Sequence, residues 1–114
     1  MRIVLTVLVV LTSLLTSCGP TCQSTCSRLY SEDQCYIRRA GHEDQTELRQ
    51  RCLNECEDAL KTPGTAGGYD PYESAGSSIN IELENETQAA LWMDCISEQD
   101  CERLEKGGFC APVW

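Results

Sequence analysis

The sequence predicts a small, mostly α-helical protein: a disulfide-stapled helical hairpin followed by one or two further short helices. Nine of its 114 residues are cysteine, close to the proportion that marks a disulfide scaffold. Two pairs of these cysteines have C-x3-C spacing, which places both sulfurs of a pair on one face of a helix. Only residues 79–83 show the alternation of a strand. Disulfides therefore have to stabilise a chain too short for a large apolar core.

Residues 1–17 have the organisation of a signal peptide. Arg2 gives a positively charged start, and the segment from Ile3 to Leu15 is mostly apolar. This segment is too short to cross a bilayer as a helix and has the length of the apolar part of a signal peptide. A buried N-terminal helix is the structural alternative, but no other segment offers an apolar face large enough to cover it.

The next residues indicate how the chain is attached. Leu15-Thr16-Ser17-Cys18 resembles the lipobox of bacterial lipoproteins, in which an aliphatic residue and two small residues precede a cysteine. The resemblance covers residues 1–18 and implies lipidation of Cys18, cleavage before it and acylation of the new amino terminus. Several acyl chains anchor a protein stably, whereas one binds only marginally. Gly19 in place of Asp favours the outer membrane over the inner one by the sorting rule of enterobacterial lipoproteins.

Lipidation of Cys18 would also resolve the odd number of cysteines. Eight would remain, enough for four disulfides in an oxidising compartment such as the periplasm or the cell surface. C-x3-C also falls within the spacing of zinc ligands, but an exported chain with a single histidine favours disulfides. No C-x2-C pair is present for redox exchange. We therefore expect no metal and no cofactor.

Composition divides the chain into successive segments. After the signal peptide we expect a lipid-anchored tether over 18–21, a Cys-rich helical hairpin over 22–61, and a Pro-, Gly- and Ser-rich loop over 62–80. An acidic helical segment over 81–114 would then pack on the hairpin, so that 22–114 form one domain. Of the 18 acidic and nine basic residues, ten acidic and only two basic ones follow residue 61. This acidity excludes nucleic acid as a partner, because phosphate binding needs a basic surface.

Capping residues set the limits of the hairpin helices. Pro20 fits the first turn of a helix over 21–30 or 21–39. Asp44 and Glu47 resemble a capping box before a second helix, whose apolar and Cys residues recur every four positions. Lysine, proline and glycine after residue 60 end that helix.

The C-terminal segment has its own caps. Asn85 with Gln88 begins a third helix, and Ser97 with Asp100 begins a short fourth one that Gly107 ends. We expect the core to be formed by Leu29, Leu53, Leu60, Leu91, Trp92 and Ile96.

Two antiparallel helices would bring the C-x3-C pairs into register, with the outer cysteine of one pair facing the outer cysteine of the other. The arrangement resembles the twin C-x3-C helical hairpins of mitochondrial intermembrane-space proteins. A local staple near the C-terminus would use two of the other cysteines, and the last two would tie the third segment to the hairpin. Eight cysteines allow many connectivities, of which we favour Cys22–Cys56, Cys26–Cys52, Cys35–Cys95 and Cys101–Cys110.

No catalytic constellation emerges from the sequence. His42-Glu43-Asp44 places a potential base beside carboxylates, but no nucleophile can be identified near it. The glycines at 64, 67 and 68 precede no Lys-Ser/Thr pair of a phosphate loop. The acidic residues between 98 and 105 lack the spacing of a calcium loop. We therefore expect a protein that is not an enzyme.

Aromatic residues outside the predicted helices are candidates for contact with a partner. Tyr69 and Tyr72 lie in the loop, where rigid side chains are useful for binding; alternatively they pack back on the hairpin. Trp114 ends an apolar tail, and it either enters the core or docks on a partner.

These features together favour a lipid-anchored, cysteine-rich bacterial lipoprotein with a structural or accessory role in a cell-envelope assembly. Its expected partners are the membrane, through the anchor, and a protein of the envelope. The alternative is a secreted, soluble cysteine-rich effector or inhibitor that acts on another protein. A third hypothesis, that the protein is a small thiol oxidoreductase, predicts a disulfide that is reduced under mild conditions.

Overall fold

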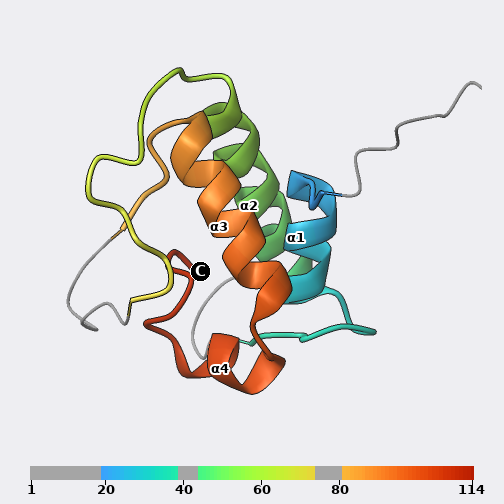
Figure 1. Ribbon diagram of the computed structural model, residues 1–114. Helices are drawn as coiled ribbons and strands as arrows, with labels where there is room; N and C mark the ends of the chain where they lie inside the picture. Colours follow the sequence, from blue (N-terminus) through green and yellow to red (C-terminus); the bar gives the residue numbers. More distant parts are fainter. Residues whose placement is uncertain (1–18, 39–43, 74–80) are drawn as a thin grey trace, which may run out of the picture.

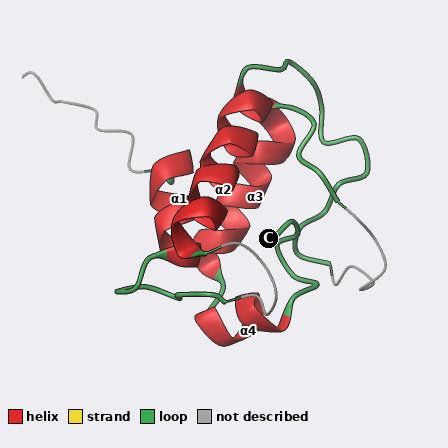
Figure 2. Cartoon of the chain, turned by 180° about the vertical axis from the view of Figure 1, so that it is seen from behind, coloured by secondary structure: helices red, strands yellow, loops and turns green. Residues whose placement is uncertain are grey.

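The computed structural model describes residues 19–38, 44–73 and 81–114. Those residues form four helices and no strand: α1 (Cys22–Tyr30), α2 (Gln45–Leu60), α3 (Glu86–Glu98) and α4 (Cys101–Lys106) (Figures 1 and 2). The predicted mostly helical, disulfide-stapled fold class is confirmed. The first helix has the shorter of its two predicted lengths, and residues 81–83 of the alternating run are not in a strand.

The first three helices form the body of the molecule. α1 and α2 are antiparallel, because the first turn of α1 is bonded to the later part of α2 through Cys22–Cys56, and Cys26–Cys52 follows one turn further on. α3 packs against both and runs parallel to α1 (Figure 1). α4 lies at the end of this bundle where α1 and α3 finish, and packs only weakly against the other helices.

Each helix begins at a polar side chain that accepts a hydrogen bond from a backbone N–H in the first turn, which leaves fewer unpaired donors at the helix start. The capping residues are Thr21, Asp44, Asn85 and Asp100. The predicted role of Ser97 is wrong, because α3 continues to Glu98 and the Ser97 hydroxyl donates to the carbonyl three residues earlier.

The core lies between the three long helices and the chain that folds back over α3. Leu29, Trp92 and Ile96 are fully buried, as predicted. The prediction for Leu60 is wrong: its side chain is 41% exposed. Cys56 is bonded to Cys22, the first residue of α1. Leu60 lies one turn further along α2, so α1 does not extend far enough to cover Leu60. The chain also buries five large side chains that we did not expect in the core: Tyr30, Ile37, Leu48, Met93 and Leu104.

The first part of the loop after α2 is fixed against the start of α3. Four carbonyl groups of this loop, those of residues 62, 64, 65 and 66, accept hydrogen bonds from the first turn of α3 or its cap. The donors are the backbone of Glu86, the hydroxyl of Thr87 and the side-chain amides of Asn85 and Gln88. Gly64 belongs to this contact, because a Cβ at this position would lie 2.6–2.8 Å from Asn85 side-chain atoms.

Arg28, in the last turn of α1, connects α1 to the end of α3. Its Nε donates to the Ile96 carbonyl at 2.9 Å, and its Nη2 donates to the Gln99 carbonyl. Carbonyl groups at the end of a helix have no partner within the helix and carry its negative dipole charge. The guanidinium group therefore pairs these groups, neutralises that charge and sets the position of α3 along α1.

Arg28→Gln is expected to lower the free energy of unfolding by about 1–3 kcal/mol, because charge-assisted hydrogen bonds to part-buried carbonyls are lost. Denaturation by guanidinium chloride with the disulfides intact measures the change. Arg38→Gln is the matched control, since Arg38 is exposed and its contacts among the described residues are with the hydroxyl and ring of the nearby Tyr36. Equal effects of the two substitutions would contradict this role of Arg28.

Gly64→Ala is expected to destabilise the fold by about 1–3 kcal/mol, because overpacking has to displace the Asn85 cap of α3. Thermal unfolding followed by circular dichroism tests this. Gly19→Ala serves as the control, because no atom lies within 4 Å of a Cβ at that position. An unchanged melting temperature in Gly64→Ala would contradict this prediction, because it would show that the loop accommodates the added methyl group without a loss of stability.

Candidate functional site

Four disulfides join the described cysteines, and two of them differ from the prediction. Cys22–Cys56 and Cys26–Cys52 form as the spacing indicates, with Cα–Cα distances of 5.7 and 5.8 Å. The predictions of Cys35–Cys95 and Cys101–Cys110 are wrong, since the observed bonds are Cys35–Cys101 and Cys95–Cys110.

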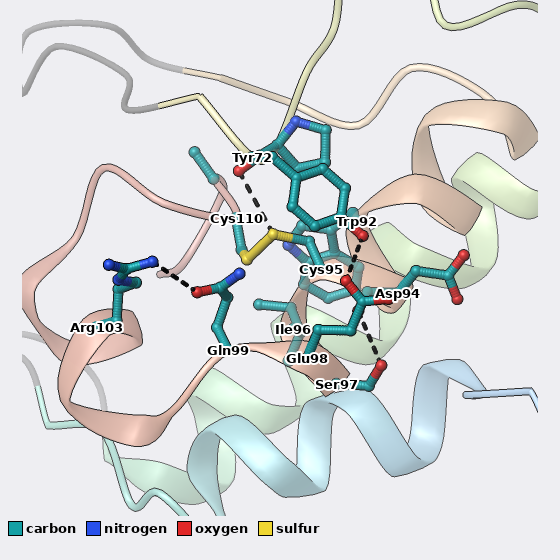
Figure 3. Close-up of a disulfide and its surroundings, with 12 residues drawn as sticks. Tyr72, Trp92, Asp94, Cys95, Ile96, Ser97, Glu98, Gln99, Arg103 and Cys110 are labelled. Carbon is teal, nitrogen blue, oxygen red and sulfur yellow. Dashed lines mark hydrogen bonds between the residues drawn. A yellow bond between two sulfur atoms is a disulfide. The ribbon is translucent and has the colours of Figure 1, made fainter.

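The reason for the difference lies in the C-terminal tail. This tail folds back over α3 instead of continuing away from α4. Trp92 Nε1 donates to the Pro112 carbonyl at 2.9 Å, so the chain returns beside α3, where Cys95 in the last turn bonds to Cys110 (Figure 3). Cys101 at the start of α4 is then left facing the segment after α1, which carries Cys35.

These bonds occupy all eight described cysteines, so none of them is a thiolate ligand for zinc. In the three described ranges, no group of three or more His, Cys, Asp and Glu side chains is placed to hold a metal ion. Cys18 and His42 both lie outside the described residues.

The two loop tyrosines have different environments. Tyr69 is partly buried against the core, and its hydroxyl donates to the Ala111 carbonyl. Burial and then the nearby Asp70 carboxylate raise the pKa of Tyr69. Tyr72 is 42% exposed, and its hydroxyl donates to Glu98 Oε2 at 2.8 Å (Figure 3). Tyr72 is therefore the loop tyrosine that remains accessible to a partner.

Trp114 packs into the molecule. Its ring lies edge-to-face on Trp92, with the centroids 5.9 Å apart. The Arg51 guanidinium lies 5.9 Å from the Trp114 ring centroid, and the Trp114 carbonyl accepts a hydrogen bond of 2.7 Å from Tyr30. Of the two roles predicted for Trp114, packing on the core and docking on a partner, the structure therefore shows packing on the core.

A cavity of about 340 Å³ lies beside α4, in a region that the sequence did not single out. Arg103 stacks over the Phe109 ring at 5.0 Å, and Lys106 pairs with Glu102 at 3.1 Å. Arg103 and Lys106 are the only two basic residues after residue 61, and this isolated basic pair is the feature of the sequence that marks the region. The lining residues are Asp100, Glu102, Arg103, Lys106 and Phe109.

Comparisons of the chain with protein-family models, with curated proteins and with solved structures found no match. In the part of the chain that the structure describes, no helix is both long and apolar enough to span a membrane.

Glu98→Ala is expected to lower the pKa of Tyr72 towards its ordinary value of 10.0, because the hydrogen bond to the Glu98 carboxylate is the largest cause of its rise. A pH titration of the Tyr72 ring by NMR measures this. Since the folded state favours the protonated hydroxyl, this stabilisation is present below the ordinary pKa and is lost as pH rises through the raised value.

Asp94→Asn is the matched control for this titration. Asp94 acts on Tyr72 only through its charge, and its effect is smaller than that of Glu98, so a smaller shift is expected. Equal shifts in the two variants would show that the general negative charge raises the pKa of Tyr72 and that the hydrogen bond does not.

Proposed function

We propose that this chain is a membrane-anchored, cysteine-rich bacterial lipoprotein whose domain has a structural or accessory protein-interaction role in the cell envelope. The observation that carries the proposal is the Leu15-Thr16-Ser17-Cys18 motif after a short apolar segment. The mutual pairing of the eight other cysteines supports it, because Cys18 is the one cysteine not used in these four bonds.

The start of α1 limits how far the domain can stand from its anchor. Three residues separate Cys18 from Cys22, so a fully extended tether reaches roughly 14 Å. The parts nearest the anchor are then the start of α1, the last turn of α2 and the residues 62–66 that cap α3. Because α1 and α3 run in the same direction, α4 and its cavity lie at the opposite end (Figure 1).

This orientation leaves the far end and the exposed Tyr72 available to another protein of the envelope. The acidic excess after residue 61 favours a partner with a basic surface, because complementary charge speeds encounter and selects among partners. It disfavours close contact of the same residues with anionic lipids. The lipid anchor supplies the membrane attachment, and the disulfide-stapled domain supplies the surface for the partner.

Cys18→Ala is expected to abolish incorporation of a labelled fatty acid and to release the protein from the membrane fraction, because the acceptor thiol is lost. Metabolic labelling and fractionation of whole cells measure both effects. Ser17→Ala is the control, since it keeps a small residue before the cysteine and should still be labelled. Cys18→Ala protein that is still labelled and still sediments with membranes would refute the anchor.

Mass spectrometry of the mature amino terminus separates this proposal from a secreted, soluble effector. A lipid-modified residue 18 at the amino terminus supports the lipoprotein. An unmodified terminus at another position, with the protein in the soluble fraction, would instead identify a secreted protein cleaved by ordinary signal peptidase.

A further inference from the structure

The four disulfides differ in how accessible they are to another molecule. Six of the eight bonded cysteines are buried, with exposed fractions of 6% or less. Cys35 and Cys101 are both partly exposed and are bonded to each other. Thiol–disulfide exchange requires a thiolate to reach one of the two sulfurs. Cys35–Cys101 is therefore the disulfide that an external thiol can attack without unfolding the bundle.

One side of this bond is a short segment fixed to the end of α1. The Cys35 N–H donates to the Arg28 carbonyl at 2.9 Å, and the Ile37 N–H donates to the Leu29 carbonyl at 2.8 Å. Between them, Tyr36 adopts a left-handed conformation with φ 47°, which is costly for a bulky residue. The flanking hydrogen bonds and the disulfide together hold this conformation.

The other side of the bond is α4. This helix has six residues and one buried side chain, Leu104, and a helix of this length is not stable alone in water. Cys95–Cys110 closes the chain on both sides of α4, while Arg28 keeps the end of α3 on α1 independently of the Cys35–Cys101 bond. Reduction of Cys35–Cys101 therefore frees one unit, the segment between Cys95 and Cys110 that contains α4, and leaves the bundle intact.

We propose that Cys35–Cys101 is a thiol-exchange site whose reactant is a dithiol, and that its reduction releases α4 and the segment after α1 from each other. A thiolate of the dithiol attacks one of the two protein sulfurs, the Cys35–Cys101 bond breaks, and the other cysteine leaves as a thiolate and takes up a proton. The second thiol of the reactant then attacks the mixed disulfide. The protein gains two thiols, and the dithiol is oxidised to a disulfide with the transfer of two electrons and two protons.

This site differs from an oxidoreductase centre, which has an exchanging pair at C-x2-C spacing. Cys35 and Cys101 are 66 residues apart, so the chain is a target of exchange whose shape responds to it. The unit released carries all the lining residues of the cavity beside α4, so reduction would move that cavity relative to the bundle. The proposal does not depend on lipidation of Cys18.

Partial reduction of the purified full-length protein by dithiothreitol, followed by alkylation and peptide mass spectrometry, tests the site. Cys35 and Cys101 are expected to be labelled at least about tenfold faster than any other bonded cysteine, because the buried sulfurs exchange only after unfolding. Labelling of any other pair at the same or a higher rate would overturn the proposal.

Hydrogen exchange on the selectively reduced protein tests the structural consequence. The amides of Ile37 and Leu104 should lose protection, while those of α2 around Cys52 keep it. Unchanged protection of Leu104 would overturn the release of α4. The Cys35→Ser/Cys101→Ser double variant should reproduce the exchange pattern of the reduced protein, and a fully protected α4 in this variant would also contradict the proposal.

Discussion

The antiparallel register of α1 and α2 is the constraint on which the rest of the fold depends. α1 has nine residues, too few to form a stable helix alone. Two disulfides one turn apart fix its position along α2 and its rotation about its own axis. This rotation directs Leu29 and Tyr30 into the core and Arg28 towards the end of α3. In the chain-entropy account, each of these bonds contributes about 3–4 kcal/mol by restricting the unfolded chain.

Once the α1–α2 pair is fixed, polar contacts with backbone carbonyls place the rest of the chain. At one end of α3 the carbonyls of residues 64–66 accept hydrogen bonds from side chains of its cap and first turn, and at the other end Arg28 donates to the last carbonyls of the helix. The C-terminal tail is held in the same way, because Trp92, Tyr69 and Tyr30 each donate to one of its carbonyls. A chain with few large apolar residues is thereby ordered through specific hydrogen bonds as well as through burial.

The sequence predicts those features of the structure that depend on spacing within one helix. The C-x3-C pairs and the caps at Asp44 and Asn85 are local patterns, and the structure bears them out. The other two disulfides depend on the return of the tail over α3, which no local pattern encodes. The same holds for Arg28, whose partners lie 68 and 71 residues away, and for the exposure of Leu60, which follows from where α1 begins.

The order of the helices separates the two features that we propose to be functional. The anchor would join the domain at the start of α1, whereas Cys35–Cys101 lies beyond its end, next to α4. α2 is antiparallel to α1, and Cys22–Cys56 joins the start of α1 to the later part of α2. An attachment at the start of α1 therefore also holds the end of α2, and through the loop after it the start of α3. Movement of α4 would therefore leave the anchored end unchanged. A domain held close to a membrane at one end and opened by dithiols at the other could change the surface it offers to a partner without changing its attachment.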